Sequence, residues 1–330
     1  MMNKKAFEMQ FNWIFVLVAG TAILLFFTVV VVKQKNVSEM STKATVLKSI
    51  EAIIIGASVG TDTTNIIDIP DSDIEVNCGR VSLGSISKQY QSLILFAPSS
   101  LKGDKLVTQT LAFSAPYRAT NLLYITSPQL RYIIIGNNNI AREINKSMPS
   151  GIKKEFYTLK PQVKNLNDYK VKFVIVGEMT DFPISLKNMQ DPDVTAIRVD
   201  GDEKKGKVEF FQKDGDSWEP KGSSSYIGKA SLMGAVHADT LESYECSMRN
   251  SFFRLNLITK IYEERAKKLT QAVSGIQCKQ LYSSALNHLI KIREASSNFN
   301  EGNIDKISAA ADSLASENKN MQVYSCPLIY

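Results

Sequence analysis

The chain has 330 residues, with 39 Lys and Arg against 33 Asp and Glu, a formal net charge of +6 and 44% hydrophobic residues. These proportions are typical of a folded protein and exclude general disorder. The basic residues are scattered among acidic ones and form no stripe, so nucleic acid is not an expected partner.

The first predicted element is the apolar segment from Phe11 to Val32. At about 1.5 Å per helical residue it spans about 33 Å, close to the hydrocarbon thickness of a bilayer. Trp13 lies near its start, where an amphipathic ring suits the headgroup boundary. A cleaved signal peptide is the alternative, but it needs a shorter apolar core and a small-residue cleavage site, which the residues up to Gln34 do not offer. The pattern predicts a membrane anchor, residues 1–37, that contacts the lipid bilayer through residues 11–32.

Lysines flank both ends of this anchor, so the positive charges do not decide its orientation. Two other features favour an exterior location for the rest of the chain. The four cysteines are an even number, and glycosylation sequons begin at Asn36 and Asn145. The expected localisation is therefore a single pass through the cell membrane, with the bulk of the chain extracytoplasmic.

Residues 38–60 carry apolar side chains at intervals of three and four, which is typical of an amphipathic helix. Gly56 and Gly60 fit the end of this helix. No Pro or Gly separates Val32 from Ser38. We therefore expect the anchor to continue into a stalk helix whose upper half packs on the globular part.

Residues 61–240 alternate short apolar runs with helical patterns, which predicts an α/β domain with a mixed sheet. Thr61 to Asp73 is predicted to be a polar turn region. Val171 to Val176 is continuous in β-branched and aromatic residues, typical of a central strand covered on both faces. Gly201 to Gly206 is predicted to be a charged turn between two strands. The other predicted strands are Ile74–Cys78, Val81–Ile86, Leu93–Phe96, Leu122–Ile125, Tyr132–Ile135, Val194–Val199 and Lys207–Gln212.

Residues 241–330 change to helical character. Helices are predicted over Tyr244–Val273, Cys278–Ala295 and Ile304–Asn318, with short joints at Gly275 and Gly302. Short joints favour antiparallel neighbours, so this subdomain is expected to be a helical stack packed on the α/β domain.

The four cysteines allow three connectivities. In an antiparallel stack the start of the second helix lies near the end of the third, which brings Cys278 close to Cys326. Cys246 lies about 30 residues from Cys278 along a rigid helix, too far for a bond. This leaves Cys246 for Cys78, and geometry favours these two disulfides. Four buried free thiols in a cytosolic domain are the alternative.

Motifs that carry catalytic or cofactor chemistry are not found in the sequence. Gly201 to Val208 follows most of a phosphate-loop pattern, but Val208 stands where a hydroxyl residue would hold magnesium. His237 is a weak catalytic candidate because Asp239 and Glu242 lie beside it, although a structural histidine is favoured. No cofactor and no metal site is expected, and an enzyme is less favoured than a binding protein.

The N-terminal run KKAFEMQFNWIFVLVAGTAILLFF resembles the anchors of archaeal single-pass surface proteins, including the class III signals of archaeal pilin-like proteins. The resemblance implies a cationic tip at Lys4-Lys5, cleavage near Ala6 and a helix that assembles into a filament core. The sequence departs from the pilin pattern because the acid expected five residues into the mature chain is absent and no Gly precedes the cleavage point. The resemblance covers about a tenth of the chain.

Together these features predict an anchored extracytoplasmic binding or structural surface protein. An anchored extracytoplasmic enzyme and a pilin-like filament subunit are the alternatives. A protein partner or self-assembly is expected through the anchor and the stalk.

Overall fold

The computed structural model describes residues 4–90, 93–164, 168–177, 186 and 188–330. The chain divides into two compact units, Met1–Ile50 and Glu51–Tyr330. The predicted α/β and helical regions both fall in the second unit. The fold class is mixed α/β, with two mixed sheets, several helices and one long apolar helix at the N-terminus.

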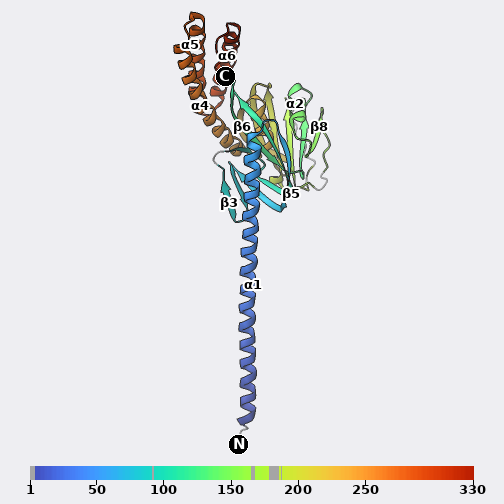
Figure 1. The fold of residues 1–330 in the computed structure, drawn as a ribbon. Coiled ribbons are helices and arrows are strands. Elements are labelled where there is room, and N and C mark those ends of the chain that lie inside the picture. Colours follow the sequence, from blue (N-terminus) through green and yellow to red (C-terminus); the bar gives the residue numbers. More distant parts are fainter. Residues whose placement is uncertain (1–3, 91–92, 165–167, 178–185, 187) are drawn as a thin grey trace. The chain divides into compact units, whose positions relative to one another are not determined.

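The N-terminal helix is α1 (Lys4–Val59), drawn in blue in Figure 1. The predicted anchor and residues 38–59 belong to this one helix. Among the described residues it is the one helix that is long and apolar enough to cross a membrane, over Phe15–Ala52. The apolar side chains of its membrane-spanning part are exposed, with Phe15 at 72%, Leu24 at 66% and Phe26 at 65%, whereas Val46, Leu47 and Ile50 farther along are buried.

Strands of the described residues form two six-stranded sheets. The first has the order β3-β2-β1-β5-β6-β4, in which only β4 and β6 pair in parallel. Its strands are β1 (Thr64–Asn77), β2 (Arg80–Leu83), β3 (Ile86–Gln89), β4 (Ile94–Phe96), β5 (Ser100–Ser114) and β6 (Arg118–Thr126).

The second sheet has the order β12-β11-β10-β9-β7-β8. The strands β8, β7, β9 and β10 are parallel, whereas β11 pairs antiparallel with both β10 and β12. Its strands are β7 (Leu130–Ile135), β8 (Lys153–Tyr157), β9 (Lys170–Val176), β10 (Val194–Gly201), β11 (Lys205–Asp214) and β12 (Ser217–Ile227). As predicted, β9 is central and buried along its whole length. The predicted turn is also present, since Gly201 opposes Gly206 between β10 and β11.

The predicted turn region over Thr61–Asp73 is wrong, because β1 begins at Thr64. The strand pairs with β5 on both sides of an irregularity between Asp68 and Ser72, and Pro70 lies inside it. Proline lacks the N–H that a ladder needs and is tolerated at a bulge, so it interrupts the pairing locally and does not end the strand.

The predicted single strand Val81–Ile86 is wrong, because the chain turns at Gly84 and Ser85 and returns as β3, which pairs with β2. Besides β3, the strands β5, β8 and β12 were not predicted from the sequence. The first half of β5 contains Lys102, Gly103 and Asp104, and β12 contains Pro220 and Gly222, residues that are depleted in strands. β12 and β8 are the edge strands of their sheet, where polar residues and Pro are tolerated. These strands depend on pairing with distant segments more than on their own composition.

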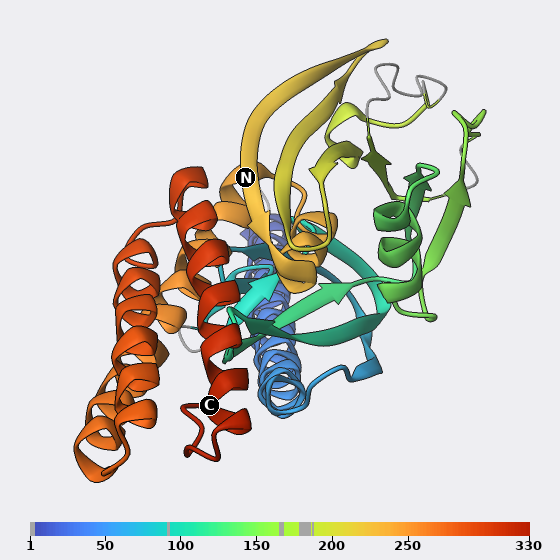
Figure 2. The ribbon, with the colours of Figure 1, turned by 90° about the horizontal axis from the view of Figure 1, so that it is seen from above.

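The remaining helices are α2 (Asn139–Ser147), α3 (Gly228–His237), α4 (Leu241–Ala272), α5 (Ile276–Ala295) and α6 (Glu301–Val323), with a 3-10 turn at Asp191–Asp193. α5 contacts both α4 and α6, and the orange-red helix α5 lies beside the red helix α6 in Figures 1 and 2. Cross-helix contacts include Arg293 to Glu263 at 2.7 Å and Ser284 to Glu317 at 2.6 Å.

Helix α3 is buried from Ala230 to His237 and contacts β4, β5 and β6 of the first sheet and β12 of the second. Gly234 makes this position possible, because a Cβ there would lie 2.7 Å from the ring of Phe96. One hydrophobic core continues from the first sheet through α3 to the helices α4, α5 and α6. A second core covers the opposite face of the second sheet, around Phe173 and Trp218.

Candidate functional site

His237, the weak catalytic candidate, ends the buried helix α3 and is itself fully buried. Its ring lies 5.1 Å from that of Tyr124 and 5.8 Å from that of Tyr132. Nδ1 lies 2.8 Å from the carbonyl oxygen of Met233, so Nδ1 carries the proton and donates it. Burial lowers the pKa of His237 to about 4; the Lys172 ammonium adds to this decrease, and the bond to Met233 opposes it. The ring is therefore neutral near pH 7.

Lys172 on β9 binds the C-terminal end of α3. Its side chain is fully buried, and Nζ donates to the carbonyl oxygens of Ala235, at 3.2 Å, and of Ala238. The last carbonyls of a helix have no partner within the helix and carry the negative end of its dipole, so an ammonium suits this position. Burial lowers the pKa of Lys172 to about 8, while the charge of Asp239 opposes the shift.

Lys170, two residues earlier on the same strand, forms a buried ion pair with Asp239. Nζ lies 2.5 Å from Oδ2, and the two side chains are 2% and 3% exposed. Ser99 joins them, because its N–H and its hydroxyl donate to Oδ2 and its oxygen accepts from Lys170. Burial by itself raises the pKa of Asp239, but the Lys170 and Lys172 ammonium groups outweigh it and hold the pKa below its ordinary value.

Lys170, Lys172 and Ser99 thus hydrogen-bond to the end of α3 and to Asp239 in the turn that follows it. A general acid or base must reach a substrate, and the fully buried ring of His237 is closed to one. Its polar contacts are to a backbone carbonyl and to tyrosine rings. The geometry therefore supports the structural role that the sequence favoured for this histidine.

The cysteines lie in the two pairs that the helix geometry favours. Cys78 lies beside Cys246 with a Cα–Cα separation of 5.7 Å, and Cys278 beside Cys326 with 5.8 Å. Both separations suit a disulfide. The first pair joins the end of β1 to α4, and the second joins the start of α5 to the segment after α6.

The other predicted site residues are dispersed. Asn145 lies half-buried in α2, where its backbone carbonyl accepts a hydrogen bond from the Lys154 ammonium at 2.8 Å. Trp13 and Val32 have exposed side chains on α1, at 75% and 57%. Phe11 and Asn36 also belong to α1, but their side chains lie outside the described set.

A cleft of about 440 Å³ is lined by the end of β1, the start of β5 and the start of α4. Asp239 and Ser99 line it together with Glu75, Asn77 and Glu242. Its lining is acidic, but Oδ2 of Asp239 already accepts from Lys170 and Ser99. Across the described part of the chain, no group of three or more His, Cys, Asp or Glu side chains is placed to hold a metal ion.

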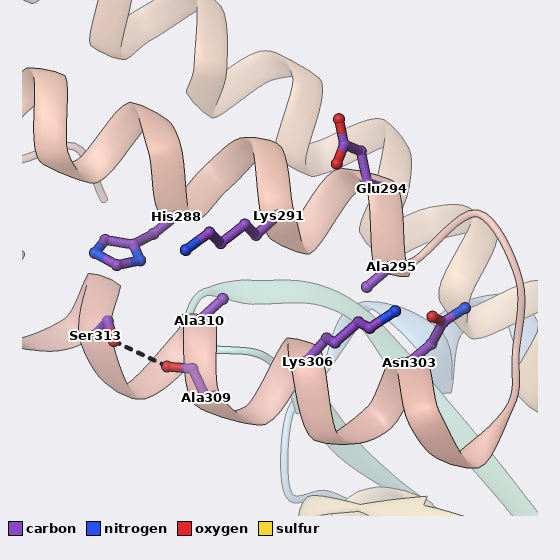
Figure 3. A pocket seen from close by; sticks show the side chains of 9 residues that line it. All are labelled: His288, Lys291, Glu294, Ala295, Asn303, Lys306, Ala309, Ala310 and Ser313. Atoms are coloured by element: carbon purple, nitrogen blue, oxygen red, sulfur yellow. Dashed lines mark hydrogen bonds between the residues drawn. The ribbon is translucent and has the colours of Figure 1, made fainter.

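A larger groove of about 570 Å³ runs between α5 and α6, as Figure 3 shows. Lys291 and His288 reach it from α5, and Lys306 and Asn303 from α6. The remaining lining residues are Glu294, Ala295, Ala309, Ala310 and Ser313. Unlike the buried cluster around His237, this groove presents charged side chains to solvent. It is therefore the candidate site for a ligand.

Sequence reasoning missed both the buried lysines and the groove. Lys170 and Lys172 alternate with Val171 and Phe173, a period of two that places both lysines on one face of the strand. His288 and Lys291 are three residues apart and share a helix face. These spacings are visible in the sequence, but burial and the approach of a second helix are not.

No protein-family model, curated protein or solved structure matches this chain.

Proposed function

We propose that this protein is a single-pass membrane protein that displays the unit Glu51–Tyr330 outside the cytoplasm as a binding or structural surface component. The observation that carries the proposal is the exposed apolar surface of α1. Nearly all side chains from Phe15 to Val32 are exposed, and none of the most apolar part is buried. Such a surface is unfavourable in water and suits the hydrocarbon of a bilayer.

The polar side chains of this segment are compatible with lipid. The hydroxyl of Thr21 donates to the carbonyl of Leu17 at 2.5 Å, and that of Thr28 to Leu25 at 2.8 Å. Polar groups without a partner are costly in hydrocarbon, and these bonds satisfy the hydroxyls within the helix itself. The two cysteine pairs at disulfide distance support an oxidising exterior compartment for the second unit.

In this proposal residues 38–59 of α1 act as the stalk, and α4, α5 and α6 form an antiparallel helical stack that belongs to the displayed unit. The bilayer is one partner, through residues 11–32. A protein ligand is the other, and the groove between α5 and α6 is the candidate surface for it.

Membrane retention tests the anchor. We expect the native protein to remain in membranes washed at high pH and a variant with Leu24→Arg and Phe26→Arg to be released. Each arginine at the centre of a span costs about 2.5 to 3.5 kcal/mol. The control is Leu24→Val with Phe26→Leu, which keeps both positions apolar. Release of the native protein would contradict the proposal.

Topology is tested by labelling intact cells with a membrane-impermeant amine reagent. We expect the exposed Lys291 and Lys306 to be labelled without cell lysis. A non-reducing peptide map is expected to contain Cys78 linked to Cys246 and Cys278 linked to Cys326. Labelling only after lysis, together with free thiols, would place the unit in the cytoplasm.

A pilin-like filament subunit is the second candidate. It is favoured by the unbroken course of α1 from Lys4 to Val59, since a filament core needs a long continuous helix. This candidate requires proteolysis near Ala6. Mass spectrometry that finds an intact Met1 or Met2 terminus in the mature protein would exclude it.

A further inference from the structure

Acidic side chains of α6 are engaged away from the groove. Asp305 pairs with Lys205 and Asp312 with Lys204, both from the turn between β10 and β11. These carboxylates therefore do not neutralise the cations of the groove. Two acids of α6 are thus bound to the second sheet, while Lys291 of α5 and Lys306 of α6 line the groove.

Lys291 and Lys306 carry the positive charge of the groove. Both are exposed, and within the described residues neither ammonium has a carboxylate partner. Glu294 also lines the groove, but its Oε1 lies 3.9 Å from Nη2 of the Arg293 guanidinium. Figure 3 shows the carboxylate of Glu294 pointing away from both lysines. The groove thus presents two unpaired cations and the imidazole of His288.

The floor of the groove is apolar and built from small side chains. Ala309 is exposed, whereas Ala295 and Ala310 are each 4% exposed and border the groove from α5 and α6. The hydroxyl of Ser313 is already used, because it donates to the carbonyl of Ala309 at 3.0 Å. No long side chain fills this floor, so an incoming segment could approach the two helices closely.

We propose that the groove between α5 and α6 binds an acidic amphipathic segment of a partner protein. Asp or Glu side chains of the segment would pair with Lys291 and Lys306, and its apolar side chains would cover the alanine floor. An anionic polysaccharide offers the same charge but has no apolar side chains for the floor. The proposal rests on the proposed function, since it names the partner class of the displayed unit.

Exposed ion pairs are weak singly and are screened by salt. Affinity for an acidic segment is therefore expected to fall as ionic strength rises. The apolar floor adds a contribution that salt does not remove, so some binding persists at high salt. A pure polyanion would lose nearly all its binding under the same conditions.

The test uses the full chain in detergent micelles and a displayed library of random peptide segments of equal length. Segments selected on the native protein are expected to be enriched in Asp and Glu next to apolar residues. The dissociation constant of a selected segment, measured by fluorescence anisotropy, is expected to rise about tenfold or more in the variant with Lys291→Glu and Lys306→Glu.

The control variant carries Lys279→Glu and Lys319→Glu. These exposed lysines lie on the same two helices, outside the groove lining, so the net charge changes equally. The control is expected to bind the segment with a nearly unchanged dissociation constant. Circular dichroism of both variants checks that the fold is retained, which surface substitutions should not alter.

Three results would overturn the proposal. The first is a set of selected segments without enrichment in Asp and Glu. The second is an equal loss of affinity in the groove variant and the control variant. The third is dextran sulfate that binds the native protein more tightly than any selected segment does and that loses this affinity in the groove variant. The last result would assign the groove to a polysaccharide. If the groove does not bind an acidic segment, membrane retention of the native protein is unchanged. If the anchor does not hold the protein in membranes, binding of the segment is unchanged. The two proposals can therefore fail separately.

Discussion

Acidification is expected to destabilise this protein through the single buried residue His237. In the folded protein its pKa is about 4, because burial and the Lys172 charge disfavour the imidazolium. In the unfolded chain the ordinary value is about 6.5. Between these two values the unfolded chain binds more protons than the folded protein. The free energy of unfolding therefore falls as the pH is lowered through this window.

The magnitude follows from the two pKa values. Linkage gives a loss of about 2 kcal/mol between pH 7 and pH 5, and of about 3 kcal/mol once the pH is below 4. Asp239 does not contribute in the upper range. Its pKa is held below the ordinary value, so its stabilisation is lost only as the pH falls below about 4. The interval from pH 7 to pH 5 therefore isolates the histidine.

The assay is urea unfolding of the full chain in detergent, followed by the fluorescence of Trp218. Trp218 packs edge-on against Phe173 in the second unit, with ring centroids 5.8 Å apart, so its emission reports unfolding there. Trp13→Phe removes the other tryptophan. We compare the native residue with His237→Phe, which keeps a ring beside Tyr124 and does not titrate.

The control for the number of histidines is His288→Gln, since His288 is half-buried and lies at the groove. The native protein and this control are expected to lose about 2 kcal/mol from pH 7 to pH 5, whereas the His237→Phe variant is expected to lose little. An equal loss in the His237→Phe variant would show that the acid sensitivity arises elsewhere. Constant stability of the native protein would show that His237 is not held neutral.

Three further predictions concern the same core. The pKa of Lys172 is about 8 in the fold and about 10.5 in the unfolded chain, so the unfolded chain binds more protons between these values. The contribution of Lys172 to stability should therefore rise by up to about 3 kcal/mol as the pH increases from 8 to 10.5, and the difference between native and Lys172→Met unfolding curves measures it. Asp239→Ala should lower the free energy of unfolding in urea by about 3 to 5 kcal/mol, because it leaves Lys170 buried without its carboxylate partner. A double variant with Lys170→Met and Asp239→Leu should recover most of this loss. Gly234→Ala should lower the unfolding free energy by about 1 to 2 kcal/mol, because overpacking against Phe96 outweighs the gain in helix propensity. An unchanged or higher melting temperature of this variant would contradict the close packing.

Local composition and periodicity were enough to predict several features of this protein. The length and apolarity around Phe15 to Val32 specify a helix able to span a membrane, whatever the rest of the chain does. The continuous β-branched run Val171 to Val176 specifies a central strand. The rigidity of a helix keeps Cys246 too far from Cys278 to pair, so helix length alone restricts the possible cysteine partners, and the observed pairs agree with that restriction.

Other features depend on contacts between distant segments, which no local pattern reveals. The first half of β5 and the whole of β12 have weak strand composition, and they form strands because they hydrogen-bond to β1 and β11. Lys170 and Lys172 would be assigned to a surface by their charge, but the end of α3 and Asp239 supply the carbonyls and the carboxylate that permit their burial. The groove likewise requires two helices to meet, because its cations come from both. A side chain's own chemistry sets the cost of burying it, whereas the partner that offsets that cost lies elsewhere in the chain.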